Sequence, residues 1–396
     1  MKNKVELLAP AGDLDRLKIA LKYGADAVYV GGPLLNLRAN AINFTLDELR
    51  EGVSFAHELH KKVYVTVNII LHNKELDDVD SYLEKLSDIG VDAIIISDPS
   101  IIPIAKKFNI EIHLSTQQST LNYEAVSFWK KQGVTRIVLA RECSKLDIME
   151  IMKHVDIEIE TFIHGAMCAG YSGRCVMSNV LTNRDANRGG CSQICRWDFN
   201  LLDCNMNEIK GDMPFTFCSK DLSMLKYIPD MISMGITSFK IEGRMRSKYY
   251  IATVVSVYRK IIDNYYHNNL DFEYDKYEQI LRNCANRDSI VQFYDGNYDS
   301  SCSYYNGRDE VSNQDFLGIV LDYDSKTQLA TIEQRNYFKK GDVVEFFGPD
   351  KLFDYVIDEV YDEDDNLIDI VRHPRQIVKV KVDRLVDIDD MLRIKK

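Results

Sequence analysis

Long hydrophobic runs are missing from this chain of 396 residues. A window of about 18 uninterrupted apolar residues would be needed to span a membrane, and none occurs. The N-terminal stretch MKNKVELLAPAGD has too short an apolar run for a secretory signal, and it carries no cleavage pattern. We therefore expect a cytoplasmic protein with no membrane attachment. In that compartment clustered cysteines serve as ligands or catalysts more often than as disulfides.

The chain also lacks an excess of positive charge. Its net charge of −12 argues against binding nucleic acid with the whole surface. Basic residues still gather in a cysteine-rich stretch, in the run Lys240–Lys248 and in Val371–Arg384. A local basic face therefore remains open.

Several catalytic motifs are absent as well. The sequence has no H-E-x-x-H, no G-x-S-x-G and no other recognisable protease motif. It has neither the C-x2-C knuckle typical of zinc sites nor the C-x3-C-x2-C triplet of radical S-adenosylmethionine enzymes. These absences argue against the common hydrolases and against radical chemistry of that type.

The stretch Glu160–Arg196 stands out because it holds four of the nine cysteines, Cys168, Cys175, Cys191 and Cys195. Four thiolates suit a [4Fe–4S] cluster, whose ligands need not be evenly spaced. Zinc is the alternative metal, although the spacing favours it weakly. Cys218 could replace Cys195 as the fourth ligand. A catalytic thiol paired with His164 is a less favoured interpretation.

The first 270 residues alternate short apolar runs with amphipathic helical stretches. Eight runs read as strands: Val5–Ala9, Ala27–Val30, Val63–Asn68, Ala93–Ser97, Glu111–Ser115, Arg136–Ala140, Glu158–Ile163 and Ser238–Glu242. Glycines end several of the helices, as left-handed caps do. Eight alternating strands predict an α/β fold, a (β/α)8 TIM-barrel-like domain. An open doubly wound sheet is the alternative.

Three regions follow from this pattern. Residues 1–270 form the predicted catalytic barrel, with a cysteine-rich insertion at 165–218 after strand seven. Pro214–Asp230 should supply the helix before strand eight, and residues 271–314 a helical and irregular connector that includes helix Tyr274–Cys284. Short strands from residue 315 to 396 predict a small C-terminal antiparallel β-barrel.

Polar residues follow the predicted strands where the active site of such a barrel lies. Lys240, Glu242 and Arg244 alternate along strand eight and so share a face, which favours contact with substrate or phosphate over a structural ion-pair network. Arg141 and Glu142 end strand six. These five and His164 are the candidate catalytic residues.

The residues around the cysteines resemble a known family. Glu160–Cys168 (ETFIHGAMC) and Gly173–Ser178 (GRCVMS) are similar to the signature of the collagenase-like peptidase U32 family. The likeness extends to Leu7–Gly12, Gly24–Gly32 and Lys240–Ser247. Within the family, Asn187–Trp197 (NRGGCSQICRW) most resembles the branch that converts a uridine of tRNA to 5-hydroxyuridine.

The resemblance implies hydroxylation of the wobble uridine in the tRNA anticodon loop. It further implies a [4Fe–4S] cluster on Cys168, Cys175, Cys191 and Cys195, with Cys218 as the other candidate, and prephenate as a small dicarboxylate co-substrate. The family name keeps a peptidase as the alternative, and a non-enzymatic RNA-binding or scaffold protein is the third. A homo-oligomer, or a hetero-oligomer with a family paralogue, is also expected. Four aromatic residues could stack on an unpaired base: Tyr171, Trp197, Tyr304 and Tyr305.

Overall fold

The computed structural model describes residues 4–37, 43–209, 211, 213–269, 271–285, 287–296, 298–305 and 316–394. The chain divides into two compact units. The first comprises Met1–Glu278 and Arg287–Glu310, and the second comprises Gln279–Asn286 and Val311–Lys396. No helix in the described ranges is long and apolar enough to cross a membrane.

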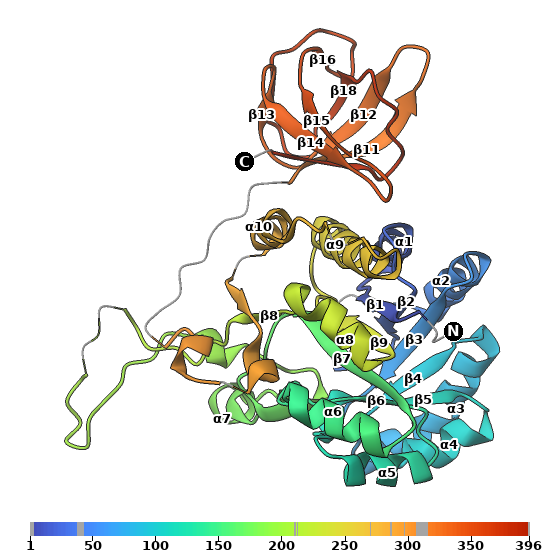
Figure 1. Cartoon of the computed structure of the whole chain (residues 1–396), viewed down its shortest axis with the longest axis vertical. Helices are drawn as coiled ribbons and strands as arrows, with labels where there is room; N and C mark the ends of the chain where they lie inside the picture. Colours follow the sequence, from blue (N-terminus) through green and yellow to red (C-terminus); the bar gives the residue numbers. More distant parts are fainter. Residues whose placement is uncertain are drawn as a thin grey trace. The chain divides into compact units, whose positions relative to one another are not determined.

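The first unit is a closed barrel of eight parallel strands (Figure 1). In spatial order they are β1 (Glu6–Pro10), β2 (Ala27–Gly31), β3 (Lys62–Val67), β4 (Ala93–Ile96), β5 (Glu111–Leu114), β6 (Arg136–Val138), β7 (Glu158–Gly165) and β9 (Ser238–Ile241). Strand β9 closes the barrel because it pairs in parallel with both β1 and β7. The predicted barrel is confirmed, and the open doubly wound sheet is wrong.

Helices surround this barrel. Outside the insertion they are α1 (Leu14–Lys22), α2 (Leu46–Glu58), α3 (Asn73–Ile89), α4 (Ile101–Lys107), α5 (Tyr123–Lys131), α6 (Lys145–His154), α8 (Ile228–Met234), α9 (Lys248–Tyr266) and α10 (Tyr274–Cys284). The α3 and α8 helices end at Gly90 and Gly235, which adopt the predicted left-handed conformation. The α9 and α10 helices have the bounds that the sequence predicts.

The segment before the last barrel strand differs from its prediction. Most of Pro214–Asp230 is not helical, since α8 begins only at Ile228. Part of that segment instead forms β8 (Asp221–Ser223), which pairs antiparallel with β7, and β10 (Ser289–Ile290) pairs with β8. Three residues are too few to show a strand period, which is why the sequence gave no signal for β8.

Charged side chains fill part of the barrel interior. Glu160 is fully buried, and Lys240 Nζ lies 2.7 Å from its carboxylate. Arg136 reaches Glu160 at 3.3 Å and also pairs with Glu6. Burial alone would raise the pKa of Glu160, but Lys240 and Arg136 outweigh burial and hold that pKa below its ordinary value. The barrel core is therefore held together by paired charges as well as by apolar packing.

The second unit contains the predicted small antiparallel barrel, as a half-barrel. Its seven-stranded sheet runs in the order β15-β14-β19-β11-β12-β18-β16. These strands are β11 (Phe316–Asp324), β12 (Leu329–Gln334), β14 (Val343–Phe347), β15 (Leu352–Val356), β16 (Val360–Tyr361), β18 (Ile377–Lys381) and β19 (Met391–Ile394), and β13 (Phe338–Lys339) pairs with β17 (Ile370–Val371). Its core is apolar, with Phe338 and Phe346 fully buried. The predicted start at residue 315 lies outside the described residues.

Replacing Glu160 by alanine should destabilise the protein strongly, because Lys240 and Arg136 would keep buried charges without their shared partner. We expect the free energy of unfolding to fall by about 3–5 kcal/mol in urea denaturation. Glu158→Ala is the matched control, since Glu158 also pairs with Arg136 but its side chain is 45% exposed. That control should cost no more than about 1 kcal/mol. Equal losses of unfolding free energy in both variants would contradict the role of Glu160 as the shared partner of Lys240 and Arg136.

Candidate active site at the barrel mouth

The cysteine-rich insertion leaves the barrel at the end of β7. It contains α7 (Met177–Thr182) and three short 3-10 turns, Tyr171–Gly173, Ala186–Arg188 and Ile194–Arg196. Gly165 ends β7 with a φ of +107°, and a side chain there would come within 2.3 Å of the Glu242 carbonyl oxygen. Only glycine fits, so the insertion starts in direct contact with the end of β9.

Two side-chain contacts hold the insertion to neighbouring barrel loops. The Ser172 amide donates to Glu142 at 2.7 Å, which ties the first turn to the loop after β6. Arg188 donates to Glu75 at 2.6 Å and to the Ile70 carbonyl oxygen at 2.6 Å, which ties the second turn to α3 and to the loop before it. The pKa of Glu75 falls to about 2, chiefly because of the bond to Arg188. Contacts on two sides place the insertion over the carboxyl ends of the strands.

The four predicted ligands come together in this insertion. Cys168, Cys175 and Cys195 are partly buried and Cys191 is exposed, whereas the alternative ligand Cys218 is buried. Burial raises the pKa of Cys168, and the thiols of Cys175 and Cys191 raise it further. Burial also raises the pKa of Cys195 to about 11, with added effects from Cys168 and Cys218. The thiols thus lie within electrostatic reach of one another. Across the described ranges, however, no three His, Cys, Asp or Glu side chains are arranged to hold a metal ion.

Arg141 links the cysteines to the end of β9. Its guanidinium lies 3.9 Å above the Phe162 ring and 3.9 Å from the Glu242 carboxylate. Tyr29 donates its hydroxyl to the Glu242 carboxylate at 3.2 Å. The positive charge of Arg141 also opposes the rise in the Cys168 pKa. Arg141 and Glu242, predicted from separate strands, are therefore neighbours.

The other predicted residues of β9 are more deeply engaged. Lys240 is 5% exposed and pairs with Glu160 inside the barrel. Arg244 is also 5% exposed and donates to Thr66 at 3.1 Å and to Asn36 at 2.9 Å. Both side chains have structural partners, and a contact of either with substrate stays a prediction.

His164 is buried at the end of β7, with its Nδ1 atom 3.2 Å from the Tyr258 hydroxyl. Burial lowers the pKa of His164 to about 3, and the charge of Arg246 contributes. The imidazole is therefore neutral at physiological pH. A role in proton transfer stays a prediction.

One buried charged residue beside the insertion, Arg287, was not among the predicted site residues. Arg287 lies 2.9 Å from Asp221, and its guanidinium lies 4.0 Å from the Cys218 thiol. Arg246 approaches the same carboxylate at 3.6 Å. Arg287 comes from the predicted connector, 69 positions from Cys218. No sequence signal marks it, because it reaches the site only through tertiary folding.

The aromatic candidates fall into two groups. Tyr171 and Trp197 are about half exposed, at 55% and 46%, on the insertion. Tyr304 instead accepts a hydrogen bond from the Asp288 amide, and Tyr305 stacks on Phe215. Tyr171 and Trp197 are therefore better placed to stack on a base from solution.

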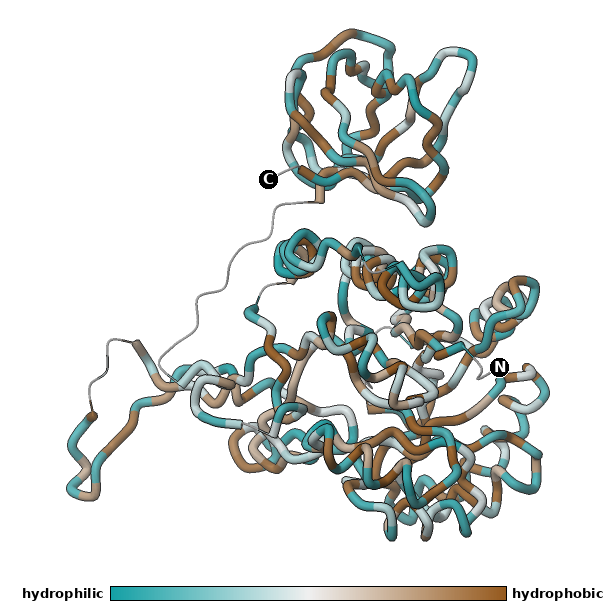
Figure 2. The backbone as a smooth tube through the Cα atoms, in the orientation of Figure 1, coloured by the Kyte–Doolittle hydropathy of each residue, from teal (hydrophilic) through white to brown (hydrophobic). Residues whose placement is uncertain are grey.

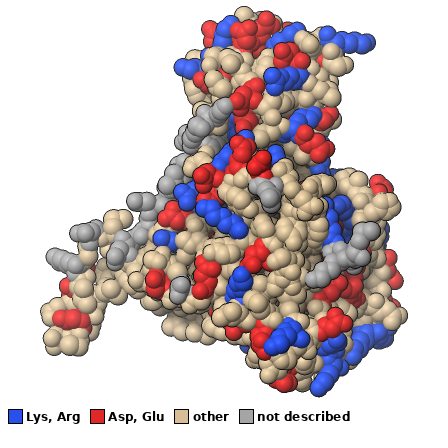
Figure 3. All heavy atoms as spheres, viewed as in Figure 1, with Lys and Arg blue, Asp and Glu red and all other residues tan. Residues whose placement is uncertain are grey.

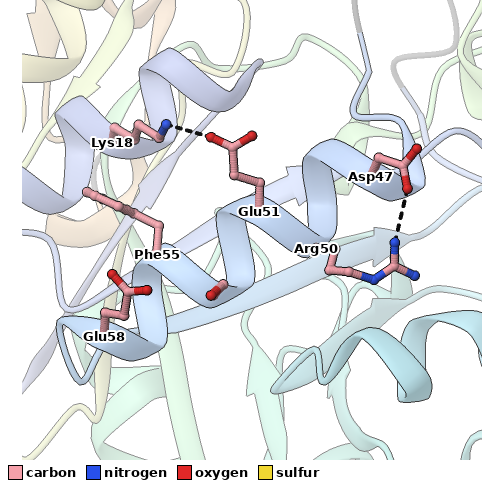
Figure 4. Close-up of a pocket in the computed structure, with 7 residues that line it drawn as sticks. Lys18, Asp47, Arg50, Glu51, Phe55 and Glu58 are labelled. Carbon is pink, nitrogen blue, oxygen red and sulfur yellow. Dashed lines mark hydrogen bonds and ion pairs between the residues drawn. The ribbon is translucent and has the colours of Figure 1, made fainter.

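A polar hollow on the outer helices carries none of the predicted site residues. Figure 4 shows that α1 and α2 line it and that its charges pair with each other, Lys18 with Glu51 at 2.7 Å and Arg50 with Asp47 at 3.0 Å. Paired surface charges of this kind bind ligands weakly, so the barrel mouth remains the candidate site.

Sequence comparison identifies the family. The profile of peptidase family U32 matches residues 12–303, and that of the peptidase family U32 C-terminal domain matches residues 312–393. The chain belongs to peptidase family U32. The two matched ranges cover the barrel from the end of β1 onward, with its insertion, and the small C-terminal half-barrel.

Relatives within family U32 carry different functional names. The "tRNA hydroxylation protein P1" of Bacillus subtilis (strain 168) is 51% identical over 98% of this chain and 94% of its own length. The "Collagenase" of Porphyromonas gingivalis (strain ATCC BAA-308 / W83) is 30% identical over 88% of this chain and 87% of its own length. A crystal structure of the C-terminal domain of a Geobacillus thermoleovorans U32 protein is 47% identical, covering 22% of this chain and 98% of that one, with a TM-score of 0.21.

The buried His164 should make stability depend on pH. Its folded-state pKa of about 3 lies below the ordinary value of 6.5, so the unfolded state binds more protons between these values. The free energy of unfolding should therefore fall as the pH drops below 6.5, by about 1 kcal/mol per pH unit. His164→Gln removes this dependence, and urea denaturation between pH 7.5 and 5 measures it. The exposed His267→Gln is the control and should follow the parent chain; a His164→Gln curve parallel to the parent would contradict the prediction.

Proposed function

We propose that this protein hydroxylates a uridine in tRNA, giving 5-hydroxyuridine at the wobble position of the anticodon loop. The main support is the 51% identity over nearly the whole chain to a relative named for tRNA hydroxylation. The thiol-rich insertion over the barrel mouth supports this, since thiolates are the usual ligands of iron–sulfur clusters, which transfer electrons. Exposed Tyr171 and Trp197 would stack on an unpaired base.

By their chemistry, the four thiols of the insertion suit an iron–sulfur cluster, although the described side chains are not arranged to hold a metal ion. Cys168, Cys175, Cys191 and Cys195 would hold a [4Fe–4S] cluster, with Cys218 in place of Cys195 as the alternative. Burial is the main cause of the raised pKa values of Cys168 and Cys195, and repulsion from neighbouring thiolates adds to it. A bound cluster would remove that repulsion and supply one-electron transfer. Replacing the C5 hydrogen of uridine by a hydroxyl group breaks the C5–H bond, takes an oxygen atom from a donor and removes two electrons, which a cluster would pass one at a time to an external acceptor.

The chain's own residues would bind and orient the reactants. Arg141 sits between Glu242 and Cys168, so it could bind one carboxylate of a small dicarboxylate co-substrate such as prephenate. Phe162 holds the guanidinium by stacking beneath it. The neutral His164, buried with Tyr258, would keep the floor of the site fixed.

Mass spectrometry of tRNA nucleosides tests the proposed reaction. A strain that lacks the gene and its paralogues should lose 5-hydroxyuridine and its derivatives, and the intact gene should restore them. Arg141→Met should restore less than a tenth of the modification. Leu146→Lys, on the exposed side of α6, is the control and should restore it fully. Unchanged tRNA in the deletion strain would refute the proposal.

Absorbance and metal analysis test the cluster. The protein purified without oxygen should be brown and contain about four iron atoms per chain, as a [4Fe–4S] cluster requires. Cys168→Ser should lose most of the iron, whereas Cys204→Ser, an exposed cysteine in the same insertion, should keep it. Comparing Cys195→Ser with Cys218→Ser identifies the fourth ligand. A colourless protein with one zinc per chain would contradict the cluster.

A peptidase is the second candidate, because the relative of 30% identity is named a collagenase. Gelatin hydrolysis that Arg141→Met abolishes would favour it. A scaffold protein, the third candidate, would support tRNA modification equally well with Arg141→Met, provided that variant folds.

A further inference from the structure

The described residues between 199 and 215 form an arm that leaves the body of the first unit. Isolated bridges join its two sides at the pairs Phe199 with Phe215 and Leu202 with Glu208 (Figure 1). At the tip, the Asp203 carboxylate accepts hydrogen bonds from the Asn207 amide at 2.9 Å and from the Asn205 amide at 2.8 Å. The Asp203 bonds therefore define the turn at the tip, and two isolated bridges connect the two sides of the arm.

The arm is unusually apolar for a projecting element. Figure 2 shows hydrophobic stretches on both of its strands. Met206 is 75% exposed, and four further apolar side chains of the arm are exposed: Leu201, Leu202, Ile209 and Met213. An isolated pair of strands is only marginally stable in water, and a contiguous apolar patch usually marks a contact surface. A partner that covers these side chains would explain both features.

The charge of the arm points to a protein partner rather than RNA. Between Trp197 and Met213 the described residues include Asp198, Asp203 and Glu208 but no lysine or arginine. Figure 3 likewise shows acidic but no basic atoms on the described part of the arm. The two undescribed positions, Lys210 and Asp212, add one charge of each sign. Phosphate groups would be repelled by this surface.

The complementary surface lies on the same insertion, around α7. Val180 is 77% exposed, Val176 67% and Leu181 52%. Val176 and Val180 are four residues apart and so lie on one side of the helix. Arg174 and Arg184, both exposed, flank the helix. This α7 patch is apolar and basic, whereas the arm is apolar and acidic.

We propose that two copies of this chain associate by reciprocal exchange of their arms, each arm covering the α7 patch of the other copy. Every copy carries both halves of the contact, so a two-fold axis makes two identical contacts and closes the assembly. Because the arm is apolar and acidic, its partner surface should be apolar and basic, and the α7 patch has both properties. The inference does not depend on the proposed reaction.

Sedimentation and light scattering of the full-length protein test the exchange. The parent chain should have twice the monomer mass of 45.6 kDa. Met206→Lys combined with Ile209→Lys should raise the dissociation constant at least a hundredfold, and so should Val180→Lys on the other half of the contact. Leu146→Lys, equally exposed on α6 at 74%, is the control and should leave the mass unchanged.

A charge exchange tests the pairing itself and guards against variants that merely misfold. Arg184→Glu and Glu208→Arg should each weaken the dimer at least tenfold, while the double variant should regain most of the lost affinity. Far-ultraviolet circular dichroism should be the same for all variants. A parent chain that stays monomeric at tens of micromolar, or a dimer that Val180→Lys leaves intact, would overturn the proposal.

Discussion

Closure of the barrel by β9 is the constraint on which the site depends. Strand β9 pairs with β7 on one side and with β1 on the other. Its register, and with it the direction in which each side chain points, cannot shift without breaking the pairing with both neighbours. Alternation along the strand then sends Lys240 toward Glu160 within the barrel and places Glu242 beside Arg141 at its mouth. A shift of one residue would turn these charges outward and leave Glu160 without its lysine. The sheet geometry therefore fixes the electrostatics of the site.

Burial separates the charged residues that stabilise the barrel core from those that remain available to bind a ligand. Lys240 and Arg136 share the Glu160 carboxylate, which has no contact with solvent. The free-energy cost of burying these three charges is therefore offset only by their ion pairs with one another. Arg141 instead sits on an aromatic ring and meets its carboxylate at 3.9 Å, a looser contact. A ligand carboxylate could replace that contact at small cost. Among the β9 and β6 candidates, Arg141 is thus the one best suited to bind substrate.

The sequence predicted the barrel because apolar runs and glycine turns are local signals. It also predicted that the four cysteines lie in one insertion after β7, whereas their joint binding of a metal stays a prediction. It failed where the structure depends on long-range contacts: β8 has three residues, and Arg287 joins Asp221 from a different region of the chain. The expected helix within Pro214–Asp230 starts only at Ile228, because the chain first returns from the arm and pairs with β7. Periodicity within a segment carries no information about such pairings.

The antiparallel strand β8 explains how one insertion can carry both the thiols and the arm. Since β8 returns along the upper part of β7, the insertion is anchored at both ends of its path, by Gly165 where it leaves and by Leu222 where it returns. Contacts through Ser172 and Arg188 fix the first half over the barrel mouth. The arm follows Cys195 and precedes Cys218, so it contains none of the five candidate ligands. The arm can therefore be altered without changing a candidate ligand, although the arm and the ligands belong to one continuous stretch of chain.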